Sequence, residues 1–284
     1  MQVIQLFKAL LSASLIICTA TIANAASSEQ HPSISDTAYS PAQCNKLLRV
    51  NRLHTYSSRY IMAKQFKLLT WNIYKAKNRD LFTDLSNLNE QVDLIFLQEA
   101  IEEPRLVKLK PYQRFSPGYK SGDTQTGVMT LSRWPATAHC TLTHEEPWLR
   151  TPKATNITEY AVSGNVRLLS VNMHGINFTL GTKAYKKQLQ DSLNVMMRHH
   201  GPIIFAGDLN AWSDARQQLI INSLTKLGLT EARYLDDKRT KTFGFALDQI
   251  WTRGVSISKI SVKQYESSDH NPILVTLEIS EQEY

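Results

Sequence analysis

Seven short apolar segments restrict the folds open to this chain more than any other feature of its sequence. They lie at residues 67–72, 94–98, 127–132, 167–173, 203–207, 247–252 and 273–279. Segments of this length are typical of β-strands, and these are too apolar to leave one face of a sheet in water. Leucines recur at helical spacing between the first two segments and again before residue 203, and Ser213 is a candidate helix N-cap. The sequence therefore predicts β-sheets whose faces are covered by helices.

The 284 residues divide into three parts by composition. Residues 1–25 are typical of a signal peptide, because Lys8 precedes an apolar run at 9–23 and small residues follow at the spacing that signal peptidase needs. Residues 26–64 form a polar extension, which we expect to be irregular. Residues 65–284 contain no linker and predict one domain. The predicted location is periplasmic or secreted; the alternative is a membrane anchor formed by an uncleaved N-terminal segment.

Charge and cysteine content add two expectations. The formal net charge is +7, and removal of residues 1–25 takes away one lysine and no acid, which leaves +6. A basic surface favours polyanions such as nucleic acid or anionic lipid headgroups, although it also serves solubility.

Cys44 and Cys140 are the cysteines that follow residue 25. In an oxidising compartment they predict a disulfide that ties the extension to the domain, and the alternative is two buried thiols.

Polar residues lie at or next to one end of several of the apolar segments, which is unusual for strands that belong in a core. They are Asn72, Gln98-Glu99, His174, Asp208 with Asn210, Asp248, and Asp269-His270. Each one alone is explained by a turn, a helix cap or a structural histidine. Six such elements in one chain indicate a shared site instead.

The residue types of this set suit the hydrolysis of a phosphodiester. That reaction needs neutralisation of charge on the phosphate, an activated water and a protonated leaving oxygen. Carboxylate oxygens bind hard divalent ions such as Mg²⁺. Histidine gains or loses a proton near neutral pH, and a neighbouring carboxylate fixes its tautomer and raises its pKa.

The motifs also resemble those of a known family in their order along the chain. They are Thr70-Trp71-Asn72, Gln98-Glu99, Asn172-Met173-His174, Gly207-Asp208-Leu209-Asn210, Leu247-Asp248-Gln249-Ile250 and Ser268-Asp269-His270. The set resembles the DNase I-like endonuclease/exonuclease/phosphatase superfamily, and the residues around these motifs resemble its YafD-like branch. The resemblance covers about residues 66–279. It implies an α+β fold: a four-layer α/β/β/α sandwich of two mixed β-sheets flanked by helices, with the site at one edge.

The resemblance implies a divalent metal and its ligands. Glu99 would be the principal Mg²⁺ ligand, with Asn72 and Asp269 completing the site. Mn²⁺ and Ca²⁺ are alternative ions for the same oxygen ligands.

The resemblance also implies roles for five further residues. Asp208 would orient or deprotonate the attacking water with help from Asn210, and His270, oriented by Asp248, would contact the phosphate. His174 would bind a phosphate oxygen or protonate the leaving group. In DNase I-like enzymes this histidine has an acidic partner, and the candidates here by residue type are Glu145, Glu146 and Asp123.

Three functions remain open on the sequence alone. Basic residues near 75–79 and 150–153 favour a nuclease of the endonuclease type. We expect the protein to be a monomer. The second is a lipid or small-molecule phosphodiesterase or phosphatase, similar to a sphingomyelinase. No segment predicts an exposed aromatic hairpin for membrane insertion, although 115–119 and 147–149 are partial candidates. The third is a binding protein that keeps the fold without catalysis, which the complete set of motif residues disfavours.

Overall fold

The computed structural model describes residues 37–51, 56–163 and 165–280. The predicted signal peptide lies outside the described residues, as does the first part of the extension. Within the described residues, no helix combines the length and apolar character that crossing a bilayer requires.

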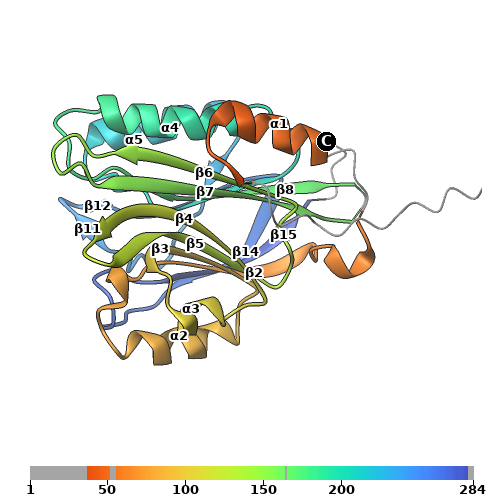
Figure 1. The fold of residues 1–284 in the computed structure, drawn as a ribbon, viewed down its shortest axis with the longest axis horizontal. Helices are drawn as coiled ribbons and strands as arrows, with labels where there is room; N and C mark the ends of the chain where they lie inside the picture. Colours follow the sequence, from red (N-terminus) through yellow and green to blue (C-terminus); the bar gives the residue numbers. More distant parts are fainter. Residues whose placement is uncertain (1–36, 52–55, 164, 281–284) are drawn as a thin grey trace, which may run out of the picture.

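Two β-sheets face each other and helices cover their outer faces, which confirms the predicted four-layer sandwich (Figure 1). The first sheet has the order β1 (Thr37–Ala38), β6 (Ala138–Glu145), β7 (Pro152–Ala161), β8 (Arg167–His174), β9 (Ile203–Asp208), β13 (Asp248–Arg253) and β10 (Thr230–Glu231). The second has the order β14 (Val255–Val262), β15 (Ile273–Ile279), β2 (Gln65–Asn72), β3 (Leu94–Ile101), β5 (Thr124–Ser132) and β4 (Tyr112–Ser121). Both sheets are mixed.

Three apolar cores hold the layers together. Helices α1 (Pro41–Asn51), α4 (Lys183–Met196) and α5 (Asp214–Lys226) pack on the first sheet, and α2 (Leu81–Asn89) and α3 (Pro104–Val107) pack on the second (Figure 1). A third core fills the space between the sheets. The predicted cap of α5 is present, because Ser213 Oγ accepts a hydrogen bond from the backbone N–H of Arg216.

Strand topology brings the polar strand ends to one edge of the sandwich. In the second sheet β2 and β3 run parallel, so Asn72 lies beside Gln98. In the first sheet β8 and β9 run parallel, which places His174 beside Asp208. Strand β13 is antiparallel to β9 and begins where β9 ends, so Asp248 also pairs with Asp208. Because β2 and β3 pack across β9 and β8, the two sets meet between the sheets.

The N-terminal extension is more ordered than the sequence suggests. Residues 37–38 add β1 to the edge of the first sheet beside β6, and α1 follows directly. Cys44 of α1 and Cys140 of β6 form a disulfide, as one of the two alternatives predicted. The expectation of an irregular segment was wrong here, because Leu48 and Cys44 of α1 are buried in the core over the first sheet.

Candidate active site

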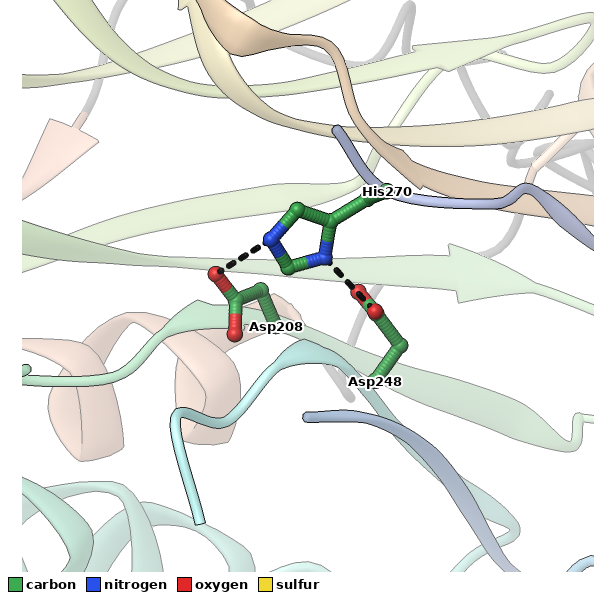
Figure 2. Close-up of side chains that lie close together, drawn as sticks. All are labelled: Asp208, Asp248 and His270. Carbon is green, nitrogen blue, oxygen red and sulfur yellow. Dashed lines mark hydrogen bonds and ion pairs between the residues drawn. The ribbon is translucent and has the colours of Figure 1, made fainter. Parts of the chain in front are cut away.

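A histidine held between two buried carboxylates lies at the shared edge of the two sheets (Figure 2). His270 Nδ1 is 2.7 Å from Asp248 Oδ2, and His270 Nε2 is 3.9 Å from Asp208 Oδ2. The loop that carries His270 is fixed by Trp71, whose indole N–H donates to the His270 carbonyl at 2.8 Å. The pairing of Asp248 with His270 that the resemblance implied is therefore present.

This arrangement sets the charges of the site. Burial acts to lower the pKa of His270, but the charges of Asp248 and Asp208 and the hydrogen bond to Asp248 outweigh it and raise that pKa to about 10. Burial raises the pKa of Asp208 to about 6, against the opposing charge of His270. A protonated His270 suits an anionic ligand, and Asp208 suits a proton acceptor that works near neutral pH.

Two amides fix the Asp208 carboxylate. Asn72 Nδ2 donates to Asp208 Oδ2 at 2.9 Å, and Asn210 Nδ2 donates to the same oxygen at 3.2 Å. The Asn210 backbone N–H donates to Asp208 Oδ1 at 3.0 Å. The position before Asp208, within β9, needs Gly207, because it has φ 136° and a Cβ there would lie 2.1 Å from the Met173 carbonyl oxygen of β8. Asn210 therefore contacts Asp208, the residue that the resemblance implied it would help, whereas the contact of Asn72 with Asp208 was not predicted, since Asn72 was expected to bind the metal.

The surroundings of His174 differ from those that the resemblance implied. His174 Nε2 is 3.0 Å from Lys153 Nζ and 3.5 Å from Asp208 Oδ2. Burial, together with the charges of Lys153 and His270, lowers the pKa of His174 well below its usual value.

None of the three candidate acids contacts His174 among the described residues. Glu146 instead accepts hydrogen bonds from the backbone N–H groups of Asn177 and Phe178 and from Thr151. Glu145 and Asp123 are exposed at the surface. The sequence placed them by type alone, and Asp208 and Glu99 lie nearer, with Glu99 Oε1 at 4.0 Å from His174 Nε2.

Glu99 projects into the site from a distorted point in β3. It has φ 51°, and the register with β5 shifts between Leu97 and Ala100. Such a bulge re-aims a side chain, and backbone strain of this kind concentrates at functional sites. The Lys75 ammonium forms an ion pair with Glu99 Oε2. The Glu99 carboxylate therefore already binds a cation, and its hard oxygens fit a divalent metal ion.

The remaining predicted metal ligands are placed less directly. Asn72 Oδ1 accepts from the Tyr74 backbone N–H at 3.1 Å. Asp269 is exposed and accepts from Ser268 Oγ at 3.4 Å, and in the described part of the chain no hydrogen bond or ion pair joins it to Glu99. The roles of Glu99, Asn72 and Asp269 as ligands stay predictions.

Asp208, Asp248 and His270 form a second group whose ligand atoms lie within 4.8 Å of one another. We favour Glu99 over this group as the metal-binding carboxylate. His270 already shares its Nδ1 proton with Asp248, and a protonated imidazole is a poor metal ligand.

Comparison with known proteins agrees with this geometry. Residues 69–270 match the family described as "Endonuclease/Exonuclease/phosphatase family". The chain belongs to this family. Its members are hydrolases that act on phosphoester bonds and depend on a divalent metal. A UPF0294 protein of Erwinia tasmaniensis is 37% identical over 223 residues, which are 77% of this chain and 83% of that protein, and it is compatible with the YafD-like branch.

Solved structures of low identity share the fold. An endonuclease/exonuclease/phosphatase from Beutenbergia cavernae has a TM-score of 0.58 and 15% identity, over 76% of this chain and 72% of that one. The mannosyl-6-phosphatase Bt3783 of Bacteroides thetaiotaomicron has a TM-score of 0.54 and 14% identity, over 74% and 98%. At these identities the likeness extends to the fold alone.

Two lysines of the site were not predicted individually. The sequence marks Lys75 and Lys153 only as members of basic stretches near possible substrate loops. The structure places Lys75 on Glu99 and Lys153, within β7 and not in a loop, on His174. No local pattern separates these lysines from the solvated ones beside them.

Proposed function

We propose that this protein is an exported, divalent-metal-dependent phosphodiesterase that cleaves nucleic acid. One observation carries the proposal: Asp208 Oδ2 lies 3.5 Å from His174 Nε2 and 3.9 Å from His270 Nε2, with Glu99 at the same edge. A proton acceptor, a cationic imidazole and a metal-binding carboxylate therefore surround one small volume. This is the set that in-line attack of water on a phosphodiester requires.

Each residue has a distinct task in that reaction. Asp208 accepts a proton from the attacking water, while Asn210 and Asn72 hold its carboxylate in place. Protonated His270, held by Asp248, donates a hydrogen bond to a phosphate oxygen and stabilises the charge that develops there. A divalent ion on Glu99, Asn72 and Asp269 would supply further charge neutralisation; Mg²⁺ is the ion we propose, with Mn²⁺ or Ca²⁺ as substitutes.

Basic and aromatic side chains beside Glu99 support nucleic acid as the substrate. Lys75 and Lys77 lie 5.0 and 4.2 Å from the centre of the Tyr74 ring, and Lys75 lies 6.0 Å from the centre of the Tyr119 ring. Cations interleaved with aromatic rings suit a strand whose phosphates pair with lysine and whose bases stack. The Cys44–Cys140 disulfide supports a periplasmic or secreted location, because such bonds persist in oxidising compartments.

A specific feature favours a lipid phosphodiesterase as the second candidate. Five exposed apolar residues, here called the apolar rim, lie on three loops next to the site: Trp148, Leu149, Phe178, Leu180 and Phe243. Glu146, in the loop that carries Trp148 and Leu149, accepts hydrogen bonds from the backbone N–H groups of Asn177 and Phe178 in the second loop. Trp212 donates a hydrogen bond to Asn177 in that second loop, and its ring packs against Phe243 of the third. Phe243 is 82% exposed between β11 (Lys241–Thr242) and β12 (Phe245–Ala246). Trp148 and Leu149 lie in 147–149, one of the two partial candidates for membrane insertion, whereas the exposed aromatic hairpin at Phe243 was not predicted.

A substrate panel tests both candidates on the purified exported protein. It contains plasmid DNA, RNA, sphingomyelin vesicles and bis(p-nitrophenyl) phosphate, each with Mg²⁺, Mn²⁺ or Ca²⁺ and with EDTA. We expect metal-dependent cleavage of DNA or RNA. Cleavage of sphingomyelin without cleavage of nucleic acid would select the second candidate, and the variant Phe243→Ser would then lower vesicle activity while leaving bis(p-nitrophenyl) phosphate turnover unchanged. No cleavage of any phosphodiester would overturn both.

A further inference from the structure

A buried lysine lies against the catalytic edge, and no acid among the described residues forms an ion pair with it, although its charge acts to lower the pKa of Asp208. Lys153 is the second residue of β7 and is 8% exposed. In the described part of the chain its ammonium has one hydrogen-bond partner, His174 Nε2 at 3.0 Å. Lys153, His174, Glu99 and Tyr119 line one small pocket at this edge. An ammonium group can donate three hydrogen bonds, so Lys153 retains donors that the described residues do not satisfy.

The chemistry of the two groups decides which one donates the hydrogen bond between Lys153 and His174. An ammonium group only donates, so His174 Nε2 accepts and the imidazole carries its proton on Nδ1. Nε2 then has no proton to give to a leaving group. His174 is itself held in place by Gln188, whose side-chain amide donates to the His174 carbonyl at 2.8 Å. Gln188 thus fixes the His174 backbone, and the imidazole accepts its hydrogen bond at Nε2 from Lys153.

We propose that Lys153 binds an oxygen of the scissile phosphate ester, and that His174 is the residue that positions Lys153 for this contact. The inference rests on the proposed phosphodiesterase function and assigns an anion-binding site within it. A buried cation with unsatisfied donors gains most from an anionic oxygen, because water no longer screens the pair. The ester oxygen nearest Lys153 would be the leaving oxygen, on the side of the phosphate away from the water that Asp208 activates.

Hydrolysis of the phosphate ester in this scheme needs no proton from Lys153 or His174. The water oxygen forms a bond to phosphorus and passes its proton to Asp208. The bond between phosphorus and the leaving oxygen breaks, and both electrons stay on that oxygen. Lys153 remains an ammonium and stabilises this charge, and solvent then protonates the released alkoxide. His174 stays neutral throughout and acts through Lys153. This differs from both roles that the family resemblance implied for it, which were binding a phosphate oxygen or protonating the leaving group.

Leaving-group dependence tests the role of Lys153. We compare wild type and Lys153→Met on bis(p-nitrophenyl) phosphate, which has a good leaving group, and on diphenyl phosphate, which has a poorer one. Removing one donor to a developing anion lowers kcat about 10²-fold. We expect a loss of this size on diphenyl phosphate and a loss at least about tenfold smaller on bis(p-nitrophenyl) phosphate, since that leaving group needs less stabilisation. Lys153→Arg should recover part of the loss.

Lys110→Met is the matched control. Lys110 is also buried, at 7% exposure, but it donates to the Asn89 and Val92 carbonyls before the start of β3, at the opposite end from Glu99. We expect this variant to keep wild-type kcat on both substrates. Thermal melts with and without inorganic phosphate add a readout that is independent of turnover: phosphate should raise the Tm of wild type and of Lys110→Met, and raise that of Lys153→Met less.

The positioning role of His174 has its own test. If His174 acts through Lys153, the double variant His174→Gln/Lys153→Met should be no slower than Lys153→Met, because residues that act as a unit are not additive. A further loss in the double variant would return His174 to direct contact with the substrate. If folded Lys153→Met loses kcat equally on the two substrates, or loses none, the proposed contact of Lys153 with the leaving oxygen is refuted. A wild-type protein that cleaves no phosphodiester would instead refute the proposed function.

Discussion

Replacement of Asp208 or His270 tests the centre of the site. Asp208→Asn removes the proton acceptor while keeping the shape of the side chain. His270→Gln removes the cation that Asp248 holds at 2.7 Å and that faces Asp208 at 3.9 Å. Each change removes an interaction that the transition state needs more than the bound substrate does.

The expected loss of activity follows from the two roles. Positioned acid–base groups contribute about 10²–10⁴ in rate, so each single variant should lower kcat at least about 10²-fold with KM little changed. A loss of 10²-fold corresponds to about 2.7 kcal/mol of transition-state stabilisation. The double variant should be scarcely slower than the poorer single one, because both residues act on one phosphate.

The effect on stability should differ between the two variants. His270→Gln leaves Asp248, which is buried, without its cation, and an uncompensated buried charge costs about 3–5 kcal/mol. At about 2–4 °C per kcal/mol for a domain of this size, the Tm should fall by roughly 10 °C. In Asp208→Asn the new amide faces two amide donors, Asn72 and Asn210, which costs about 1–3 kcal/mol. Relief of carboxylate burial offsets part of this cost.

Steady-state kinetics on bis(p-nitrophenyl) phosphate beside circular dichroism melts measures both effects. His144→Gln is the control, since it breaks a His–Asp hydrogen bond of 2.8 Å to Asp191 that does not contact the site acids. It should lose some stability and keep kcat. Folded Asp208→Asn or His270→Gln protein with near wild-type kcat would refute the reasoning, because the pair would then be structural.

Three further predictions concern the metal, the disulfide and acid stability. Glu99→Gln should keep the fold and raise the Mg²⁺ concentration needed for half-maximal activity, because a neutral amide is a poorer ligand; an unchanged Mg²⁺ titration would remove Glu99 from the site. Cys44→Ser/Cys140→Ser should lower the free energy of unfolding by about 4 kcal/mol or less, since the bond spans 96 residues, and urea melts measure this. Burial lowers the pKa of His139 to about 3, below its unfolded value near 6.5. Between these two pH values the unfolded state binds more protons than the folded state, so the free energy of unfolding should fall as the pH drops from about 6.5 to 3. His139→Gln should flatten this dependence in pH-dependent melts, whereas His200→Gln at the surface should not.

The apolar strands and their polar ends were predictable because a strand that is covered on both faces is apolar along its length, so polar residues at its ends stand out in the sequence. Each of the seven apolar segments corresponds to a strand, although Leu247 precedes β13, and Ile273–Ile279 has the predicted bounds. The other strands of the described residues were missed: the long strands β4, β6, β7 and β14, and the two-residue strands β1, β10, β11 and β12. Strand β7 contains Lys153, Thr155 and Asn156 among its buried residues, so it lacks the apolar run that marks a core strand. The Asn156 side-chain NH2 group forms its hydrogen bonds through tertiary contacts, such as those to Ser116 Oγ and His139 Nε2.

The acids and the lysines of the site differ in what the sequence reveals. Asp208 and Asp248 end or begin apolar strands, and the pairing of β9 with β13 brings such positions to one edge whatever the rest of the chain does. Lys75 reaches Glu99 from a turn with φ 60°, and Lys153 reaches His174 from a strand that the sequence did not predict. Their positions depend on backbone geometry that carries no residue signature. Substrate choice within one fold is set by such groups around a common set of acids. We therefore expect Lys75, Lys153 and the apolar rim to determine the substrate of this chain, which the motifs that identify the family do not determine.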